Sequence, residues 1–505
     1  MKDGFIRVAA ATPDIHVADP QYNSEQIIEL MEQGSTRGVK VMAFPELCLT
    51  AYTCSDLFLQ ESLLREAKKE LKRILQASKS KDMILFVGMP WMHKGKLYNV
   101  AAVLNRGRIL GIVPKKHLPN YSEFYELRHF NPGMEKVEMT DWEGVQVPMG
   151  MNLLFACRTM PELVLAAELC EDVWVPCPPS ISHALAGATV IANCSASDET
   201  TGKDQYRYNL ICGQSARLVC GYIYANAGEG ESSQDLVFGG QNIIAENGTC
   251  LVQSDRFKNA CICADLDLGR IISERRRMTT FRDEENRSAS YETVYFELNT
   301  EDSAKKDSKK AGQKRDELLR YIDPAPFVPH DAGQRERRCE EILSIQAMGL
   351  KKRLAHTNCK HAVIGLSGGL DSTLALLVTV RAFDMLQIPR ENIHCITMPC
   401  FGTTDRTYTN ACTMAKKTGA SLTEINIRDA VTGHFKDINH DIEKHDVTYE
   451  NGQARERTQI LMDIANEVGG MVIGTGDMSE LALGWATYNG DHMSCTVSMH
   501  LCRKH

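Results

Sequence analysis

The stretch Ala362-Val-Ile-Gly-Leu-Ser-Gly-Gly-Leu-Asp-Ser-Thr-Leu-Ala-Leu-Leu-Val378 decides the fold of the C-terminal part of the chain. A short apolar run, two adjacent glycines and a long apolar run predict a strand, a tight turn and a helix. The glycines let backbone N–H groups of the turn point inward, and the helix N-terminus adds a partial positive charge. The stretch therefore predicts a cradle for an anion such as phosphate, although Ser-Gly-Gly alone would also fit an ordinary turn.

Polar groups at this turn make the prediction of a phosphate site more specific. Ser367 and Ser372 supply hydroxyl donors, Gly368 and Gly369 supply backbone donors, and Asp371 is placed to hold Mg²⁺ beside phosphates. The phosphate loop of kinases and GTPases is excluded, because no Gly-Lys-[Ser/Thr] follows the glycines. Ser-Gly-Gly-x-Asp-Ser between a strand and a helix resembles the PP-loop of ATP pyrophosphatases. That resemblance implies activation of an oxygen as an adenylate, with release of pyrophosphate.

Two later stretches belong to the same predicted domain. Met471–Gly474 reads as a second strand, and Thr475, Asp477 and Glu480 follow it in a polar turn. Side chains at the carboxyl end of a parallel strand face the ligand in open α/β sheets. The stretch Tyr449–Thr458 opens a helix with charges of both signs, which equally fits a solvated helix start.

A change in composition divides the chain. Residues 301–312 are charged and nearly free of large apolar side chains, and three prolines follow between 324 and 329. This composition is typical of a solvated, partly extended linker. We therefore predict an N-terminal domain at 1–295, a linker at 296–334 and a second α/β domain at 335–505.

The N-terminal domain alternates strand-like and helix-like segments. Phe5–Pro13 and Val41–Glu46 read as strands on either side of an amphipathic helix at Ser24–Gly38. Hairpins are expected around Asn105–Gly107 and Glu246–Gly248, where a glycine follows an apolar run. The pattern predicts a mixed α/β domain.

Bulk composition excludes several classes of protein. The net charge of −8 argues against nucleic-acid and anionic-membrane binding, and no apolar run approaches the roughly 18 residues of a membrane span. The N-terminus lacks a signal-peptide pattern. The 18 cysteines include no Cys-x-x-Cys pair, and Cys261-Ile-Cys263 alternates like a strand, which argues against structural zinc. A cytoplasmic protein with reduced thiols is expected.

Three groups of the N-terminal domain suggest chemistry. Glu46 ends a strand in Phe-Pro-Glu, Lys115 ends another in Val-Pro-Lys-Lys-His-Leu-Pro, and Cys170 ends the apolar run before Glu-Asp-Val-Trp. Amide hydrolysis through a thioester needs a carboxylate that takes the thiol proton and an ammonium that stabilises the oxyanion. An arbitrary set of these residue types would usually be structural, since free cysteines are mostly buried apolar side chains.

The two acids after the thiol need a separate explanation, because neighbouring negative charge raises a thiol's pKa. If a short helix begins just after Cys170, Glu171 and Asp172 occupy its first turn, where carboxylates bind free backbone N–H groups. We therefore interpret both acids as structural.

The motifs Phe-Pro-Glu, Pro-Lys-x-His-Leu-Pro with Tyr-Ser-Glu-Phe-Tyr-Glu, and Glu-Leu-Cys-Glu-Asp-Val-Trp resemble the nitrilase (carbon–nitrogen hydrolase) superfamily. The resemblance implies a four-layer αββα sandwich with Glu46 as general base, Lys115 as oxyanion stabiliser and Cys170 as nucleophile. Glu126 matches a second carboxylate of such sites. Lys116 is the alternative for the lysine role, but Lys115 fits the spacing to His-Leu.

The combination of this domain with a PP-loop domain resembles bacterial glutamine-dependent NAD synthetases, as do Asn-x-Gln-Ala-Arg-Glu-Arg-Thr, Gly-Thr-Gly-Asp-x-Ser-Glu and Leu-Gly-Trp-Ala-Thr-Tyr-Asn-Gly-Asp-His-Met-Ser. The resemblance implies that glutamine hydrolysis supplies ammonia through a tunnel. ATP adenylates the nicotinate carboxylate of deamido-NAD in a Rossmann-like, doubly wound domain, and ammonia displaces AMP to give NAD. It also implies a homo-oligomer with paired synthetase domains.

Further site residues are implied by the same resemblance. They are Tyr121, Glu126 and Ser195 for glutamine; Ser367, Gly368, Gly369, Asp371, Ser372 and Thr475 for ATP; Asn451, Arg457, Asp477 and Glu480 for deamido-NAD; and Asp371 and Glu480 for Mg²⁺.

Two features depart from the family pattern. Cys400 stands where a glycine is usual, so a turn needing positive φ would be strained there. After Ser494 the chain leaves the pattern and stops, which predicts a C-terminally incomplete synthetase domain from a truncated or frameshifted reading. A glutaminase or amidase with an inactive second domain, or a non-catalytic partner subunit, would then be the alternatives. GMP synthetase is disfavoured because its relatives carry another type of glutaminase domain.

Overall fold

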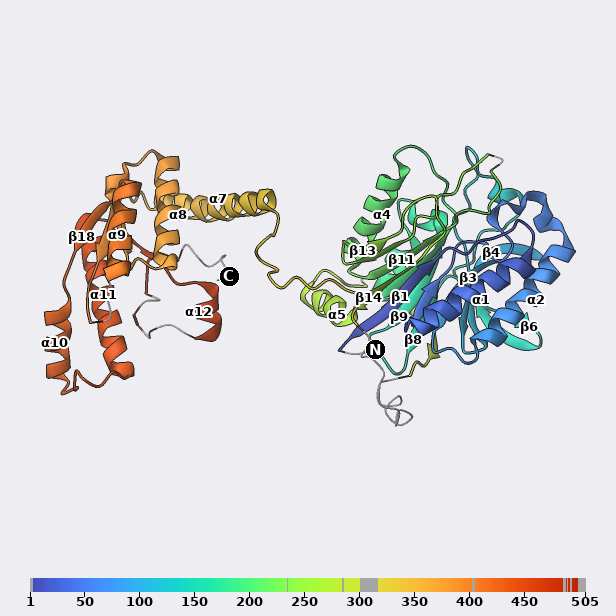
Figure 1. Cartoon of the computed structure of the whole chain (residues 1–505), viewed down its shortest axis with the longest axis horizontal. Coiled ribbons are helices and arrows are strands. Elements are labelled where there is room, and N and C mark those ends of the chain that lie inside the picture. Colours follow the sequence, from blue (N-terminus) through green and yellow to red (C-terminus); the bar gives the residue numbers. More distant parts are fainter. Residues whose placement is uncertain are drawn as a thin grey trace. The chain divides into compact units, whose positions relative to one another are not determined.

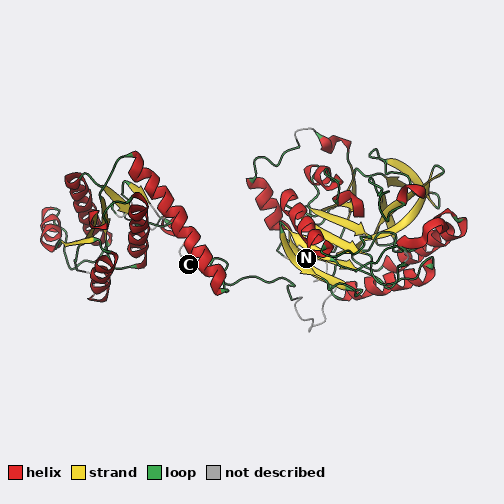
Figure 2. Cartoon of the chain, turned by 90° about the horizontal axis from the view of Figure 1, so that it is seen from above, coloured by secondary structure: helices red, strands yellow, loops and turns green. Residues whose placement is uncertain are grey.

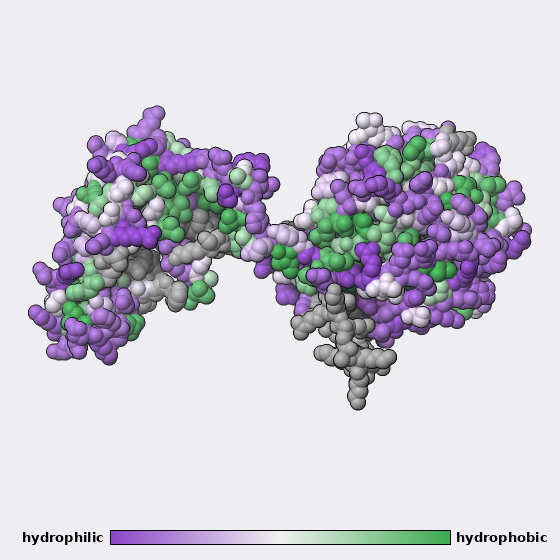
Figure 3. All heavy atoms as spheres, viewed as in Figure 1, coloured by the Kyte–Doolittle hydropathy of each residue, from purple (hydrophilic) through white to green (hydrophobic). Residues whose placement is uncertain are grey.

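The computed structural model describes residues 3–233, 235–283, 286–299, 317–401, 405–484, 487, 489–490 and 493–497. The chain divides into two compact units, Met1–Tyr321 and Ile322–His505 (Figure 1). The visible surface of both is mostly hydrophilic, with scattered hydrophobic patches (Figure 3). None of the described helices is both long and apolar enough to cross a membrane.

The first unit contains two β-sheets. The strands of the eight-stranded sheet are β1 Phe5–Ala11, β2 Val41–Ala43, β3 Ile84–His93, β4 Lys96–Asn105, β5 Arg108–Pro114, β6 Glu138–Trp142, β7 Val145–Met149 and β14 Cys261–Asp267, in the order β14-β1-β2-β3-β4-β5-β7-β6. Those of the seven-stranded sheet are β8 Leu153–Cys157, β9 Val164–Leu169, β10 Val190–Ser195, β11 Gly221–Asn226, β12 Ile243–Glu246, β13 Thr249–Gln253 and β15 Glu292–Phe296, in the order β13-β12-β11-β10-β9-β8-β15.

Helices cover the outer faces of these sheets (Figure 2). The α-helices are α1 Pro20–Thr36, α2 Glu61–Ser78, α3 Pro179–Leu185, α4 Lys203–Leu218 and α5 Leu268–Arg277. The 3₁₀ helices are η1 Tyr52–Leu59, η2 Glu126–Arg128, η3 Cys170–Val173 and η4 Arg287–Ser290.

Strand periodicity explains the layers. Val8 and Ala10 of β1 belong to the core between the two sheets, whereas Ala9 and Ala11 belong to the core beneath α1 and α2. Successive side chains of a strand point to opposite faces, so a strand buried on both faces is apolar throughout. A third core lies between the seven-stranded sheet and the helices α3 and α4. The expected αββα sandwich is confirmed.

The predicted hairpins are present. β4 and β5 are joined at Arg106 and Gly107, and β12 and β13 at Asn247 and Gly248, all with positive φ. Two consecutive residues with positive φ form the type I′ turn, whose twist matches that of the strands. Cys261-Ile-Cys263 lies in strand β14, as its alternation predicts.

The second unit is a five-stranded parallel sheet with helices. Its strands are β16 Ala362–Gly365, β17 Ile393–Thr397, β18 Ser421–Glu424, β19 Met471–Gly474 and β20 Thr496–Val497, in the order β18-β17-β16-β19-β20. Its helices are α7 Ala332–His356, α8 Leu370–Leu386, α9 Asp405–Thr418, α10 Arg428–Asp437, α11 Val447–Val468 and α12 Met478–Leu483, with the 3₁₀ helix η5 Arg390–Asn392.

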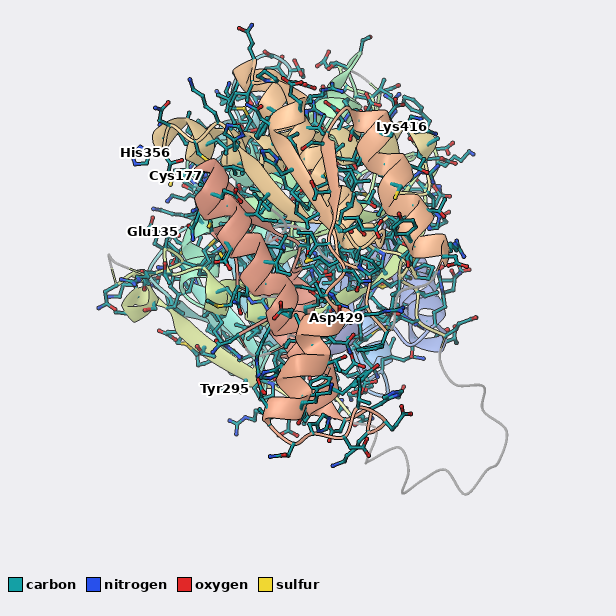
Figure 4. The ribbon with its side chains drawn as sticks, turned by 90° about the vertical axis from the view of Figure 1, so that its left-hand side faces the viewer. Glu135, Cys177, Tyr295, His356, Lys416 and Asp429 are labelled. Carbon is teal, nitrogen blue, oxygen red and sulfur yellow. The ribbon has the colours of Figure 1, made fainter. Side chains whose placement is uncertain are left out.

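Strand order in this unit confirms the doubly wound prediction. The chain moves outward from β16 to β18, then returns to the other side of β16 for β19, so the order reverses between β16 and β19. Ligands of open α/β sheets bind at such a switch point, beyond the carboxyl ends of the strands. Lys416 in the last turn of α9 and Asp429 in the first turn of α10 (Figure 4) suit the helix dipoles.

The condition under which Cys400 would be strained, a positive φ, is not met. Its side chain is buried in the core beside α11, and its backbone lies outside the left-handed region. The turn after β17 therefore accommodates a side chain at this position, because it lacks the positive φ on which the expected strain depended.

Candidate functional site

The two sheets of the first unit bring the three predicted groups to one place. Glu46 follows β2 and Lys115 follows β5 in the eight-stranded sheet, and Cys170 follows β9 in the seven-stranded sheet. Each residue thus lies just beyond the carboxyl end of its strand.

Lys115 is the centre of this site. Its Nζ donates to Glu46 Oε1 at 2.6 Å and to Glu126 Oε1 at 2.6 Å, and all three side chains are buried. Burial alone would lower the pKa of Lys115, but the carboxylates of Glu126 and Glu46 outweigh it and raise that pKa well above its usual value. Lys116 Nζ instead pairs with Glu135 (Figure 4) at 2.7 Å, at the surface. Of the two lysines, Lys115 alone contacts the buried carboxylates.

Glu46 is held through both oxygens. Asn99 Nδ2 donates to Oε1 at 2.6 Å, and the backbone N–H of Ala196 donates to Oε2 at 3.1 Å. Gly88 of β3 packs directly against this loop, because a Cβ there would lie 2.3 Å from the carbonyl oxygen of Pro45. A fixed carboxylate beside the thiol has the geometry of a general base.

Cys170 occupies a tight strand-to-helix turn. Its φ is +40°, in the region that non-glycine residues rarely adopt, and its N–H donates to Asn193 Oδ1 at 3.1 Å. Burial and the charge of Glu46 raise the pKa of the thiol, while Lys115 and the hydroxyl of Ser195 oppose that shift. Cys170 is therefore a thiol at rest and needs a base to become a nucleophile.

The two acids beside the thiol occupy the first turn of η3, as expected. Asp172 has two roles. It caps η3 by accepting from the N–H of Leu169 at 3.1 Å, and it also accepts from the N–H of His117 at 2.9 Å. Glu171 accepts from the hydroxyl of Tyr121 at 2.9 Å, at the surface. Asp172 thus ties the loop after β5 to the turn that carries Cys170.

A pocket reaches this site. It is lined by Tyr52, Thr53, Ser55, Phe58, Glu123, Phe124, Tyr125, Glu126, His129, Phe130, Ser232, Asp235 and Leu236. The hydroxyl of Tyr52 donates to Glu126 Oε1 at 2.8 Å, so the pocket adjoins the partner of Lys115. Burial, together with the charge of Glu46, raises the pKa of Glu126 to about 7 against the opposing effect of Lys115.

Sequence reasoning missed Asn99, Asn193 and Tyr52. The two asparagines lie inside buried strands, β4 and β10, where nearly every neighbour is apolar. Buried polar side chains are normally hydrogen-bonded, so an asparagine in an apolar strand was the available signal. Tyr52 carried no comparable signal, because its partner Glu126 is distant in the sequence.

In the second unit the predicted cradle lies at the start of α8. Gly369 N–H donates to Ser367 Oγ at 3.3 Å, and the hydroxyls of Ser367 and Ser372 lie 3.1 Å apart. Gly368 has φ +82°, and a Cβ there would lie 2.0 Å from the carbonyl oxygen of Thr407. Asp371 lies in the first turn of α8. The turn therefore requires glycine and presents hydroxyl groups beside a helix N-terminus.

The groups after β19 lie beside this cradle in the topology, since β19 pairs with β16. Thr475 directly follows β19. Asp477 and Glu480 cap their own helix reciprocally: Glu480 N–H donates to Asp477 Oδ1 at 2.8 Å and Asp477 N–H to Glu480 Oε2 at 3.2 Å. Asn451 and Arg457 lie on α11, on different helical faces. Among described residues, no three histidine, cysteine or acidic side chains are arranged to hold a metal ion.

Comparison with known proteins gives two family matches. Residues 7–276 match the carbon–nitrogen hydrolase family, and residues 342–500 match the NAD synthase family. Glutamine-dependent NAD(+) synthetase of Mycobacterium leprae is 42% identical over 502 residues, covering 97% of this chain and 72% of that protein. The protein of the same name from Aquifex aeolicus is 29% identical over 492 residues, covering 96% and 77%.

The chain is also similar to solved structures. A glutamine-dependent NAD(+) synthetase from Cytophaga hutchinsonii has a TM-score of 0.47 at 23% identity, covering 97% of this chain and 78% of that one. An amidase of the nitrilase superfamily from Nesterenkonia has a TM-score of 0.42 at 20% identity, covering 54% and 94%.

Proposed function

The chain belongs to the family of glutamine-dependent NAD(+) synthetases, and from this premise we propose that Glu46, Lys115 and Cys170 hydrolyse the side-chain amide of glutamine. The observation that carries the proposal is the placement of Lys115, which is buried in contact with the carboxylates of Glu46 and Glu126. Like Cys170, Lys115 lies just beyond the carboxyl end of a strand. Glu126 Oε2 and Asn99 Oδ1 support it, since neither has a hydrogen-bond partner within the described part of the chain. An amide NH₂ group is a suitable donor for such oxygens.

The proposed reaction begins with proton transfer. Glu46 takes the proton of the Cys170 thiol as the sulfur attacks the amide carbon, and the ammonium of Lys115 stabilises the oxyanion. The proton on Glu46 then passes to the leaving nitrogen, which departs as ammonia and leaves a γ-glutamyl thioester. Water, deprotonated by Glu46, hydrolyses the thioester to release glutamate and restore the thiol.

For the second unit we propose ATP-dependent amidation of deamido-NAD. Ser367, Gly368, Gly369 and Ser372 suit the pyrophosphate of ATP, because a glycine turn at a helix N-terminus presents N–H groups to phosphate. Asp371 fits a Mg²⁺ ion bound mainly by phosphate oxygens, since one or two carboxylates suffice for such an ion. Bound Mg²⁺ would neutralise phosphate charge during adenylation. Glu480 is the less direct candidate, because its carboxylate caps α12.

Thr475 is proposed as a nucleotide contact, because it follows β19 next to the switch point. Asn451, Arg457 and Asp477 are proposed as deamido-NAD contacts, although Asp477 is buried as the cap of α12. Tyr121 and Ser195 are proposed as glutamine-positioning residues, one beside Glu171 and the other beside the thiol.

A paired assay tests this assignment. Glutamate release is followed with glutamine, and NAD formation with deamido-NAD, ATP, Mg²⁺ and either glutamine or ammonium. Cys170→Ala should abolish glutamate release and glutamine-driven NAD formation while ammonium-driven NAD formation persists. If Cys170→Ala still releases glutamate, the nucleophile is misassigned. If the unaltered chain releases glutamate but forms NAD from neither nitrogen source, it is a glutaminase with an inactive second unit.

A further inference from the structure

A chain of buried polar groups runs behind the proposed nucleophile and takes no part in the reaction just described. It starts at Glu168 of strand β9, two residues before Cys170, and passes through Tyr222 of β11 and Asn193 of β10. Glu168 is an acid in an otherwise apolar strand, so neither its position nor its burial follows from core packing.

The contacts form a continuous path to the backbone of Cys170. The hydroxyl of Tyr222 donates to Glu168 Oε1, Asn193 Nδ2 donates to that hydroxyl oxygen at 3.1 Å, and Asn193 Oδ1 accepts the N–H of Cys170 at 3.1 Å. Asn193 stands opposite Glu168 in the register of β9 and β10. The path thus links three strands of one sheet directly behind the catalytic turn.

The helix layer fixes the far end of this path. The N–H of Ser180 in α3 donates to Glu168 Oε2 at 2.8 Å, and Gln214 Nε2 in α4 donates to Ser180 Oγ at 3.0 Å. Both oxygens of Glu168 are therefore bound, and Glu168, Asn193 and Tyr222 are almost completely excluded from solvent. A fully satisfied buried network holds its members in single conformations.

Each hydrogen bond in this path has a fixed direction when Glu168 is ionised. An ionised carboxylate only accepts, so Tyr222 donates to Glu168 and its oxygen is left to accept from the NH₂ group of Asn193. The carbonyl oxygen of Asn193 then faces the N–H of Cys170. Without the Tyr222 hydroxyl, nothing in the path distinguishes the two ends of the amide, and a rotated Asn193 would set its NH₂ group against the Cys170 N–H.

We propose that Tyr222 and Glu168 are positioning residues for glutamine hydrolysis: through Asn193 they bind the N–H of Cys170 and hold the nucleophile in its strained, positive-φ turn. The proposal rests on the assignment of Cys170 above. Because Cys170 sits at φ +40°, its sulfur keeps its direction only while the surrounding structure imposes that backbone conformation. A displaced nucleophile loses rate rather than substrate affinity.

The test compares Tyr222→Phe with Tyr291→Phe. The control removes a tyrosine hydroxyl that bonds His183 Nδ1 of α3 at 2.8 Å, in the same helix layer. In Tyr222→Phe we expect kcat for glutamate release to fall about ten- to a hundredfold, with KM for glutamine unchanged within about twofold. Ammonium-driven NAD formation should stay unchanged in both variants, and Tyr291→Phe should keep its kcat.

Several outcomes overturn the proposal. One is an unchanged kcat in Tyr222→Phe, another is an equal fall in Tyr291→Phe, and a third is a rise in KM with constant kcat. If Tyr222→Phe loses its fold, shown by loss of ammonium-driven activity or of the thermal transition, Glu168→Gln replaces it. That isostere has a single oxygen, so it can accept from Tyr222 or from the N–H of Ser180 but not from both, and kcat for glutamate release should fall. An unchanged kcat in Glu168→Gln overturns the proposal. Failure of Cys170→Ala to stop glutamate release would instead refute the underlying assignment.

Discussion

The two candidate sites differ in how much of their charge the protein itself supplies. In the first unit Lys115, Glu46 and Glu126 are buried and in direct contact, and Glu46 is bound through both oxygens. In the second unit the cradle residues Ser367 and Ser372 bond to each other and to the backbone of the turn. One site is an assembled array of charges, and the other is an open turn with polar groups.

Chemistry accounts for this difference. Glutamine is uncharged at the amide that reacts, so the protein must supply the base and the cation, fixed before the substrate arrives. A nucleotide brings its own negative charge, so glycine N–H groups, hydroxyls and a helix N-terminus are sufficient. Glutamate release at the first site should therefore be sensitive to the loss of a single charge, and NAD formation at the second site to a change of backbone shape.

The largest effect should follow loss of the central charge in the first site. Lys115→Met leaves Glu46 and Glu126 buried without their cation, which typically costs about 3–5 kcal/mol of stability. Glutamate release should fall at least about a hundredfold, because the oxyanion loses its stabilising group. Lys116→Met is the matched control and should change neither quantity, since Lys116 pairs with Glu135 at the surface. Thermal unfolding and a glutamate assay measure both; equal effects of the two substitutions would contradict the central role of Lys115.

A change of shape should dominate in the second site. Gly368→Ala places a Cβ about 2 Å from the carbonyl oxygen of Thr407 at a positive φ, so the turn must move. NAD formation should fall at least about tenfold with glutamine and with ammonium alike, while glutamate release continues. Gly433→Ala in α10 is the control, because a Cβ there meets nothing within 4 Å. If Gly368→Ala forms NAD at the unaltered rate, NAD formation does not depend on the backbone shape of this turn.

A change of shape can also be applied to the first site. Gly88→Ala would place a Cβ 2.4 Å from the backbone nitrogen of Leu47, which adjoins Glu46. The loop that presents the general base must shift, and glutamate release should fall about tenfold or more. Gly213→Ala in α4 is the control, because a Cβ there meets nothing within 4 Å and the φ of Gly213 is not positive. Ammonium-driven NAD formation should be the same in both variants.

Much of this architecture was predictable from local sequence. Alternating apolar segments, the glycines of the two hairpin turns and Ser-Gly-Gly-x-Asp-Ser indicate the sheets, the hairpins and the cradle, because each pattern is contained in a few adjacent residues. The partners Asn99, Asn193 and Tyr222 were not predictable in the same way. Their roles depend on strands that are separate in the sequence and meet only in the folded sheet. The capping role of Glu480 was also missed, because the family resemblance suggested a metal ligand at this position.

The smallest expected effect concerns stability and pH in the first site. Burial raises the pKa of Glu126 to about 7 from its ordinary value of 4.5, so between these values the folded chain binds more protons than the unfolded chain. Stability from this group is full below about pH 4.5 and is lost as the pH rises towards 7. Glutamine at position 126 cannot titrate, so Glu126→Gln does not lose this contribution. The melting temperature of Glu126→Gln minus that of the unaltered chain should therefore increase from pH 5 to pH 8.

Glu123→Gln, three residues earlier in the same pocket wall, is the matched control for replacing a carboxylate by an amide there. Other buried acids, including Glu168, are common to both proteins and cancel in the difference of melting temperatures. A difference that stays constant with pH would mean that Glu126 is ionised throughout, with Lys115 offsetting its burial completely. The roles of the two carboxylates beside Lys115 would then be separated by their distinct hydrogen-bond partners, Tyr52 for Glu126 and Asn99 for Glu46.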